Sequence, residues 1–146
     1  MLKPELSIAM LAVAFPAFAF TNIPANTAVV RALNKQTGRT KDIEIPVGTE
    51  QIFENVSIAM KSCFTRPEDE VPENTAFMQI FETGANFKEE MGTAKKGASV
   101  FSGWMYSSSP SLNAMEHPNY DIWLLECRDD PRRPKIAMPE PAAPAE

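Results

Sequence analysis

The chain has 146 residues, a formal net charge of −5 and 23% charged residues, which suits a single domain. An acidic chain lacks the basic patch that nucleic-acid phosphates require, so we expect no nucleic acid as a partner. Two cysteines and one histidine are too few for a structural zinc site, which usually has four ligands. The sequence also lacks a glycine-rich phosphate loop, so it predicts no cofactor and no metal.

Residues 1–19 predict a cleaved secretory signal peptide. Lys3 precedes an apolar run over 6–15, and Ala17 and Ala19 have the A-x-A spacing of a cleavage site. The run is too short for a membrane-spanning helix, which needs roughly 20 apolar residues, so we expect no transmembrane segment in the mature chain. The predicted localisation is the periplasm.

Three parts follow the signal peptide: a loose polar lead over 20–27, a β domain over 28–128 and a tail over 129–146. Within the domain, apolar residues recur with the two-residue period of strands rather than the helical period. Strands are predicted at 28–33, 41–47, 52–60, 76–82, 100–107 and 120–127. Glycine and proline turns between such strands indicate an all-β fold, a small antiparallel sandwich or barrel of about five to seven strands.

Two smaller features complete this outline. A helical turn is expected at 110–116, because Ser109 can cap it and Pro110 suits its first turn. The tail holds five prolines in 18 residues, a composition that predicts a disordered segment. The acidic loop at 68–73 lacks the alternating ligands and the glycine of a calcium loop, so we expect it to be solvated.

Cys63 and Cys127 are the two cysteines. An oxidising compartment favours a disulfide between them, which would close a loop of about 64 residues and add roughly 4 kcal/mol of stability. Two buried thiols are the alternative. Strand alternation counts against the bridge, because it places Cys63 on the same side as Lys61, away from Met60. A β-bulge or a strand end near Ser62 would reconcile the two observations.

Residues 101–127 contain both tryptophans, both tyrosines and the histidine. The strands at 100–107 and 120–127 carry large side chains on both faces, which is typical of central strands covered on both sides. We therefore expect Trp123 to be nearly buried in the core, and core packing is also the first expectation for Trp104. Trp104 and Tyr106 could instead join a binding surface if one face of their strand is open.

The connection over 107–120 is the predicted binding surface, because polar and aromatic residues on a loop between rigid strands suit recognition. We expect His117 at the surface or in a shallow cleft at the turn. A catalytic Ser/His117/Asp121 set is an alternative, although no G-x-S-x-G elbow surrounds a serine. The candidate binding residues are Trp104, Tyr106, Ser107, Ser108, Ser109, Glu116, His117, Asn119, Tyr120 and Asp121.

Two long segments carry a resemblance to a known family: VVRALNKQTGRTKDIEIPVG and FSGWMYSSSPSLNAMEHPNYDIWLLEC, with a strand ending at Cys63 between them. They resemble the bacterial family catalogued as domain of unknown function 2155, over roughly residues 29–127. Members of that family carry a signal peptide and two matching cysteines, so the resemblance implies the same compartment and supports pairing of Cys63 with Cys127. It implies no activity, and no catalytic residue carries over.

Three functions follow from these observations. The prediction is an exported, non-enzymatic module that binds an envelope protein or ligand through the loop 107–120. A purely structural envelope subunit, with its aromatic residues in the core, is the first alternative, and exposure of Trp104 would discriminate against it. A small hydrolase is the second alternative, and it requires a serine hydroxyl within hydrogen-bond reach of His117.

Overall fold

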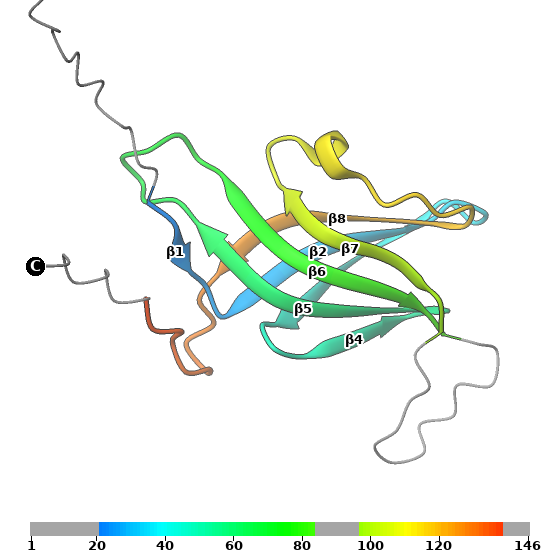
Figure 1. Ribbon diagram of the computed structural model, residues 1–146, viewed down its shortest axis with the longest axis horizontal. Coiled ribbons are helices and arrows are strands. Elements are labelled where there is room, and N and C mark those ends of the chain that lie inside the picture. Colours follow the sequence, from blue (N-terminus) through cyan, green and yellow to red (C-terminus); the bar gives the residue numbers. More distant parts are fainter. Residues whose placement is uncertain (1–20, 84–96, 139–146) are drawn as a thin grey trace, which may run out of the picture.

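The computed structural model describes residues 21–83 and 97–138, and these form two antiparallel sheets packed face to face (Figure 1). The larger sheet has the order β1-β5-β6-β7, with β4 also paired to β5, and the smaller sheet has the order β3-β2-β8. The strands are β1 (Ile23–Pro24), β2 (Thr27–Asn34), β3 (Arg39–Pro46), β4 (Glu50–Phe53), β5 (Val56–Thr65), β6 (Asn74–Glu82), β7 (Ser99–Tyr106) and β8 (Tyr120–Arg128). This arrangement confirms the all-β sandwich.

The described residues contain eight strands, one more than the predicted range. The stretch predicted as one strand over 52–60 is a hairpin, because the chain turns at Glu54 and Asn55 between β4 and β5. Glu54 has a φ of 51°, a left-handed conformation that is uncommon outside glycine. The short β1 was not predicted. The predicted signal peptide, most of the 84–98 connection and residues 139–146 lie outside the described residues.

The core lies between the two sheets and is built from alternate residues of the central strands. Each fully buried aliphatic side chain contributes roughly 1.5–3 kcal/mol relative to exposure. The smaller sheet contributes one set of these side chains and the larger sheet the other. Among the fully buried residues are Val30 and Leu124 from the smaller sheet, and Val56, Ile58, Met60, Met78 and Ile80 from the larger one.

A β-bulge in β5 accounts for the orientation of Cys63. Met60 and Ser62 pair with consecutive residues of β6, which leaves Lys61 without a partner in that strand. The extra residue shifts the alternation of the strand, so Cys63 is buried like Met60 although it lies three positions further on. The bulge near Ser62 that the disulfide required is therefore present.

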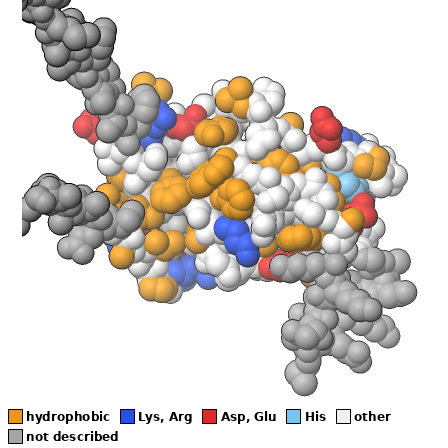
Figure 2. Space-filling model, in the orientation of Figure 1, with side chains coloured by type: hydrophobic (Ala, Val, Ile, Leu, Met, Phe, Trp, Pro, Cys, Tyr) orange, Lys and Arg blue, Asp and Glu red, His pale blue; other side chains and the backbone are white. Residues whose placement is uncertain are grey.

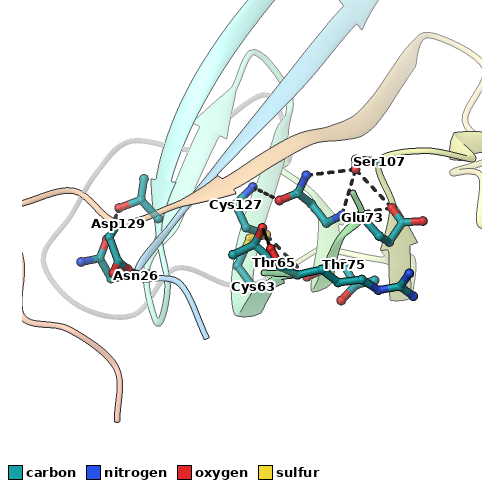
Figure 3. The surroundings of a disulfide bond; sticks show 11 residues. Asn26, Cys63, Thr65, Glu73, Thr75, Ser107, Cys127 and Asp129 are labelled. Atoms are coloured by element: carbon teal, nitrogen blue, oxygen red, sulfur yellow. Dashed lines mark hydrogen bonds between the residues drawn. A yellow bond between two sulfur atoms is a disulfide. The ribbon is translucent and has the colours of Figure 1, made fainter. Parts of the chain in front are cut away.

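A second bulge does the same for Cys127. Leu124 and Glu126 pair with consecutive residues of β2, which leaves Leu125 unpaired and turns Cys127 inward together with Leu124. The Cα atoms of Cys63 and Cys127 lie 5.7 Å apart, and their sulfur atoms are bonded (Figure 3). The disulfide thus joins β5 of the larger sheet to β8 of the smaller sheet, and its prediction is confirmed.

The strands β7 and β8 are edge strands, not central ones. Their inward residues are buried as predicted, but their outward faces are only partly covered. Trp123 is half-buried on β8, and 40% of the Trp104 surface on β7 is exposed. The prediction that both faces of each strand are covered is therefore wrong, as is the nearly complete burial expected of Trp123. The outward ring of Trp104 packs against rings of neighbouring strands in its own sheet, and the described residues form two sheets without a third layer.

The free edge of β7 is covered by the chain that follows it. A 3₁₀ turn, η1 (Pro110–Asn113), confirms the predicted helical turn in a shorter form, and Ser109 makes no capping hydrogen bond with its side chain. The Asn113 side chain donates to the carbonyl of Trp104 (2.8 Å). A Cβ at Gly103 would lie 2.8 Å from the Asn113 amide nitrogen, so a larger residue at 103 would force the Asn113 side chain to move. Such covering blocks pairing with another strand.

The end of β8 is fastened to the start of the domain through Asn26. Its Oδ1 accepts the backbone N–H of Asp130 (2.7 Å), and its Nδ2 donates to the carbonyls of Asp130 (3.1 Å) and Pro134 (3.3 Å). The Asp130 carboxylate is buried, and the guanidinium of Arg132 binds both of its oxygens (2.9 and 2.8 Å). Hydrogen bonds from Arg132 hold the pKa of Asp130 well below its usual range.

These contacts move both predicted boundaries outward. Residues 129–134 are attached to the domain, so the tail does not leave it at 129. In the predicted lead, Ile23 and Pro24 pair with β5, and Ala25 and Asn26 are buried. In the described part of the chain, no helix is long and apolar enough to cross a membrane.

Candidate functional site

The predicted binding residues fall into two groups at opposite ends of β6. Ser107 accepts hydrogen bonds from Asn74, at the start of β6, and His117 contacts Glu82, at its end. Eight residue steps along a strand span on the order of 26 Å. The loop between β7 and β8 therefore runs along the length of the sheet, and its two ends belong to different surfaces.

This separation argues against the Ser/His117/Asp121 arrangement that the hydrolase alternative requires. Ser107 and Ser108 donate to Glu73 at one end of the sheet. His117 lies at the other end, where Nε2 faces the Glu82 carboxylate at 3.1 Å. The Asp121 carboxylate forms an ion pair with Lys35 at 3.0 Å. Within the described residues these side chains form no Ser–His–Asp triad.

The first surface is the outer face of the larger sheet. The rings of Phe64 on β5, Phe77 on β6 and Trp104 on β7 lie next to one another there. The Trp104 ring centroid is 5.4 Å from that of Phe77, with an edge-to-face orientation, and 6.0 Å from that of Phe64. Hydrophobic side chains gather across this face (Figure 2). We call Phe64, Phe77 and Trp104 the aromatic face.

Uncharged polar side chains adjoin the aromatic face. Pairing between β6 and β7 aligns Thr75 with Tyr106 and Gln79 with Ser102, on either side of the Phe77–Trp104 pair. The Gln79 amide donates to the Ser102 hydroxyl (3.4 Å). Tyr106 is half-buried. This surface therefore offers ring faces and neutral hydrogen-bonding groups, a combination suited to recognition rather than to acid–base chemistry.

Ser107 and Ser108 hold the loop in place at this end. The Glu73 carboxylate accepts the Ser107 hydroxyl (3.2 Å), the Ser108 hydroxyl and the Ser108 backbone N–H (3.1 Å). Burial opposes the charged form of Glu73, but these hydrogen bonds outweigh it and lower the pKa of the carboxyl. Asn74 donates to Ser107 and accepts the N–H of Cys127 (3.1 Å) (Figure 3). The network ties the loop to the disulfide.

The second surface surrounds His117, which the sequence placed at the surface or in a shallow cleft. Only 6% of its side chain is exposed, so it lies at the wall of a cleft but is more deeply buried than expected, whereas Trp123 is only half-buried. His117 Nδ1 accepts the backbone N–H groups of Asn119 (3.1 Å) and Tyr120 (3.2 Å). Its ring stacks on Tyr120 with centroids 5.2 Å apart. These contacts satisfy the imidazole without water.

The cleft beside His117 has a volume of about 330 Å³. We call it the His117 cleft. It is formed where the β4–β5 turn, the end of β6, the start of β7 and the start of β8 meet. Its lining residues are Asn55, Glu82, Thr83, Gly97, Ala98, His117, Asn119 and Tyr120. The sequence pointed to His117, Asn119 and Tyr120 but not to the others, because these come from the β4–β5 turn, the end of β6 and the residues next to β6 and β7, none of which carries a motif.

The remaining predicted residues have other roles. Lys35 Nζ, besides pairing with Asp121, donates to the carbonyl of His117 (2.9 Å). Burial raises the pKa of Tyr120, and its hydrogen bond to the Glu54 carboxylate adds to the rise. Glu116 is exposed, and Ser109 precedes η1. Across the described residues, no three His, Cys, Asp or Glu side chains are grouped to hold a metal ion.

The fold and these two surfaces define a small disulfide-linked β-sandwich with an aromatic face and a separate polar cleft. The chain belongs to the family of domain of unknown function 2155, described as an uncharacterized protein conserved in bacteria, whose model matches residues 28–127. The resemblance seen in the sequence is thereby confirmed.

A relative is found in the bacterium Rickettsia prowazekii. The uncharacterized protein RP359 of Rickettsia prowazekii (strain Madrid E) is 32% identical over 96 residues, which make up 66% of this chain and 57% of that protein. This chain therefore covers a little over half of the relative's length. No solved structure matches the chain.

Proposed function

We propose that this protein is an exported, non-enzymatic module of the bacterial envelope that binds a partner or ligand through the aromatic face. The observation that carries the proposal is the exposure of Trp104, 40% of whose surface is open although it contacts two other rings. The alternative of a purely structural subunit requires this side chain to lie in the core, so its exposure argues against that alternative. Contiguous exposed apolar surface is typical of interaction sites.

The position of the aromatic face adds support. Its three rings stand on three adjacent hydrogen-bonded strands, which fixes their spacing before a ligand arrives. Rigid aromatic residues bind with little loss of conformational entropy and are enriched among residues that dominate binding energy. Export is supported by the apolar run and A-x-A spacing at the N-terminus, and a disulfide suits an oxidising compartment.

A pull-down from periplasmic extract with matched variants tests the proposal. Trp104→Ala removes the central ring of the aromatic face and is expected to abolish capture of any partner retained by the wild-type protein. Leu112→Ala is the control, because Leu112 is 72% exposed and lies on the loop in η1 rather than on the face. Loss of capture with Leu112→Ala but not with Trp104→Ala would show that the partner binds the loop and not the aromatic face.

A further inference from the structure

We propose that the His117 cleft binds a cationic group, the ammonium or guanidinium of a basic side chain on a partner polypeptide, with the Glu82 carboxylate as its counter-ion. This site is independent of the aromatic face, since the two lie at opposite ends of β6. The argument rests on how Glu82 is held, on the charge balance of the cleft and on its size.

His117 fixes the Glu82 carboxylate in place. Because Nδ1 accepts two backbone N–H groups, the ring proton lies on Nε2 and is donated to Glu82 Oε1 at 3.1 Å. The imidazole cannot turn away without breaking all three bonds and its stacking on Tyr120. Glu82 itself remains 53% exposed, and its second carboxylate oxygen has no hydrogen bond to the described residues. The cleft therefore presents one oriented acceptor to an incoming group.

The charge balance favours a cation. Glu82 is the single carboxylate among the described lining residues, and none of them is a lysine or arginine. A further carboxylate, that of Glu54, lies close by, because it accepts the hydroxyl of Tyr120 and the side-chain amide of Asn34 (2.7 Å). The ammonium of Lys35 pairs with Asp121 instead. An anion would be repelled here, and an apolar group would desolvate Glu82 without a compensating bond.

The remaining lining explains why a basic side chain fits better than a metal ion or a larger ligand. A volume of about 330 Å³ is at the small end of ligand pockets, roughly 300–1,000 Å³, so it admits one long side chain. Asn55 and Asn119 supply amide groups beside the carboxylate. A guanidinium or ammonium carries several N–H donors and forms charge-assisted hydrogen bonds with such acceptors. Divalent cations need more carboxylate ligands than the described residues bring together.

The test uses N-acetyl-arginine amide as the probe and N-acetyl-citrulline amide as its uncharged isostere. The full-length gene is expressed in a secreting host, and binding is followed by ¹H–¹⁵N NMR. We expect saturable shifts at Asn55, Thr83 and Asn119 with the arginine probe, with a Kd on the order of millimolar. The citrulline probe should leave these signals unmoved. Absence of saturable shifts with the arginine probe, or equal binding of the two probes, would overturn the proposal.

A pair of variants separates this site from general attraction between charges. Glu82→Gln keeps an acceptor for His117 but removes the charge, and we expect it to weaken binding of the arginine probe at least tenfold. Glu68→Gln removes the same charge from an exposed residue in the loop before β6, at the other end of the sheet, and should leave binding unchanged. Equal effects of the two variants would contradict a site at Glu82. Unchanged spectra elsewhere confirm that each variant is folded.

Discussion

Reduction of the Cys63–Cys127 bridge should remove a large share of the stability of the domain. The bridge closes a loop of 64 residues, and the chain-entropy relation for a loop of this length gives about 4 kcal/mol at 25 °C. A domain of this size is stable by about 5–15 kcal/mol in total. Because both cysteines are buried between the sheets, reduction should lower the stability of the whole sandwich.

Urea unfolding of the oxidised and reduced protein, followed by tryptophan fluorescence, measures this loss. With a slope of about 2 kcal/mol/M, a loss of about 4 kcal/mol shifts the midpoint by about 2 M. The Cys63→Ala/Cys127→Ala variant is the second form of the same test and should match the reduced protein within about 1 kcal/mol. A loss below about 1 kcal/mol in both would refute the reasoning that the bridge restricts the unfolded chain.

Three further predictions concern the contacts that shape the domain. Asn26→Ala should cost about 2–3 kcal/mol in urea unfolding, because it leaves the buried N–H of Asp130 without its acceptor; a cost below about 0.5 kcal/mol would show that 129–134 is not attached through Asn26. Deletion of Lys61 should preserve the disulfide, because it removes the unpaired residue of a bulge. Deletion of Ala59 should impair the disulfide by reversing the faces of β5. Titration of free thiols distinguishes a preserved disulfide from an impaired one. The folded-state pKa of Asp130 lies below its unfolded value. Its contribution to the stability of the fold is therefore complete above about pH 4 and is lost as the pH falls further. Asp130→Asn should flatten the fall of Tm with pH in that range, and an unchanged slope would count against the Arg132 pairing.

Periodicity was sufficient to predict most of the strands, because burial of one face of a strand leaves a clear alternation. It failed at Glu54 and Asn55, where the chain turns without glycine or proline. Glu54 adopts its positive φ there, and its carboxylate accepts hydrogen bonds from Asn34 and from Tyr120. Residues that are distant in the sequence supply both partners, so no local pattern indicated the turn.

The site was harder to predict for a related reason. The number of large side chains on β7 and β8 was clear from the sequence, but whether a further layer covers them depends on the order of strands in each sheet. His117 was expected at the surface or in a shallow cleft because it lies in the connection between two strands. Its ring can be buried because two backbone N–H groups and Glu82 satisfy its nitrogen atoms. The attachment of 129–134 likewise depends on one distant residue, Asn26, which composition does not reveal.

Site-specific photo-crosslinking in living cells tests the central claim, that the aromatic face is the binding surface, most directly. A photoreactive phenylalanine analogue replaces Ser102, which is exposed beside the aromatic face on β7, or, as a control, Trp123 on the outer side of β8. The account predicts a discrete crosslinked product after irradiation with the analogue at position 102 and none with it at position 123. Products from 123 alone, or from neither position, would contradict it.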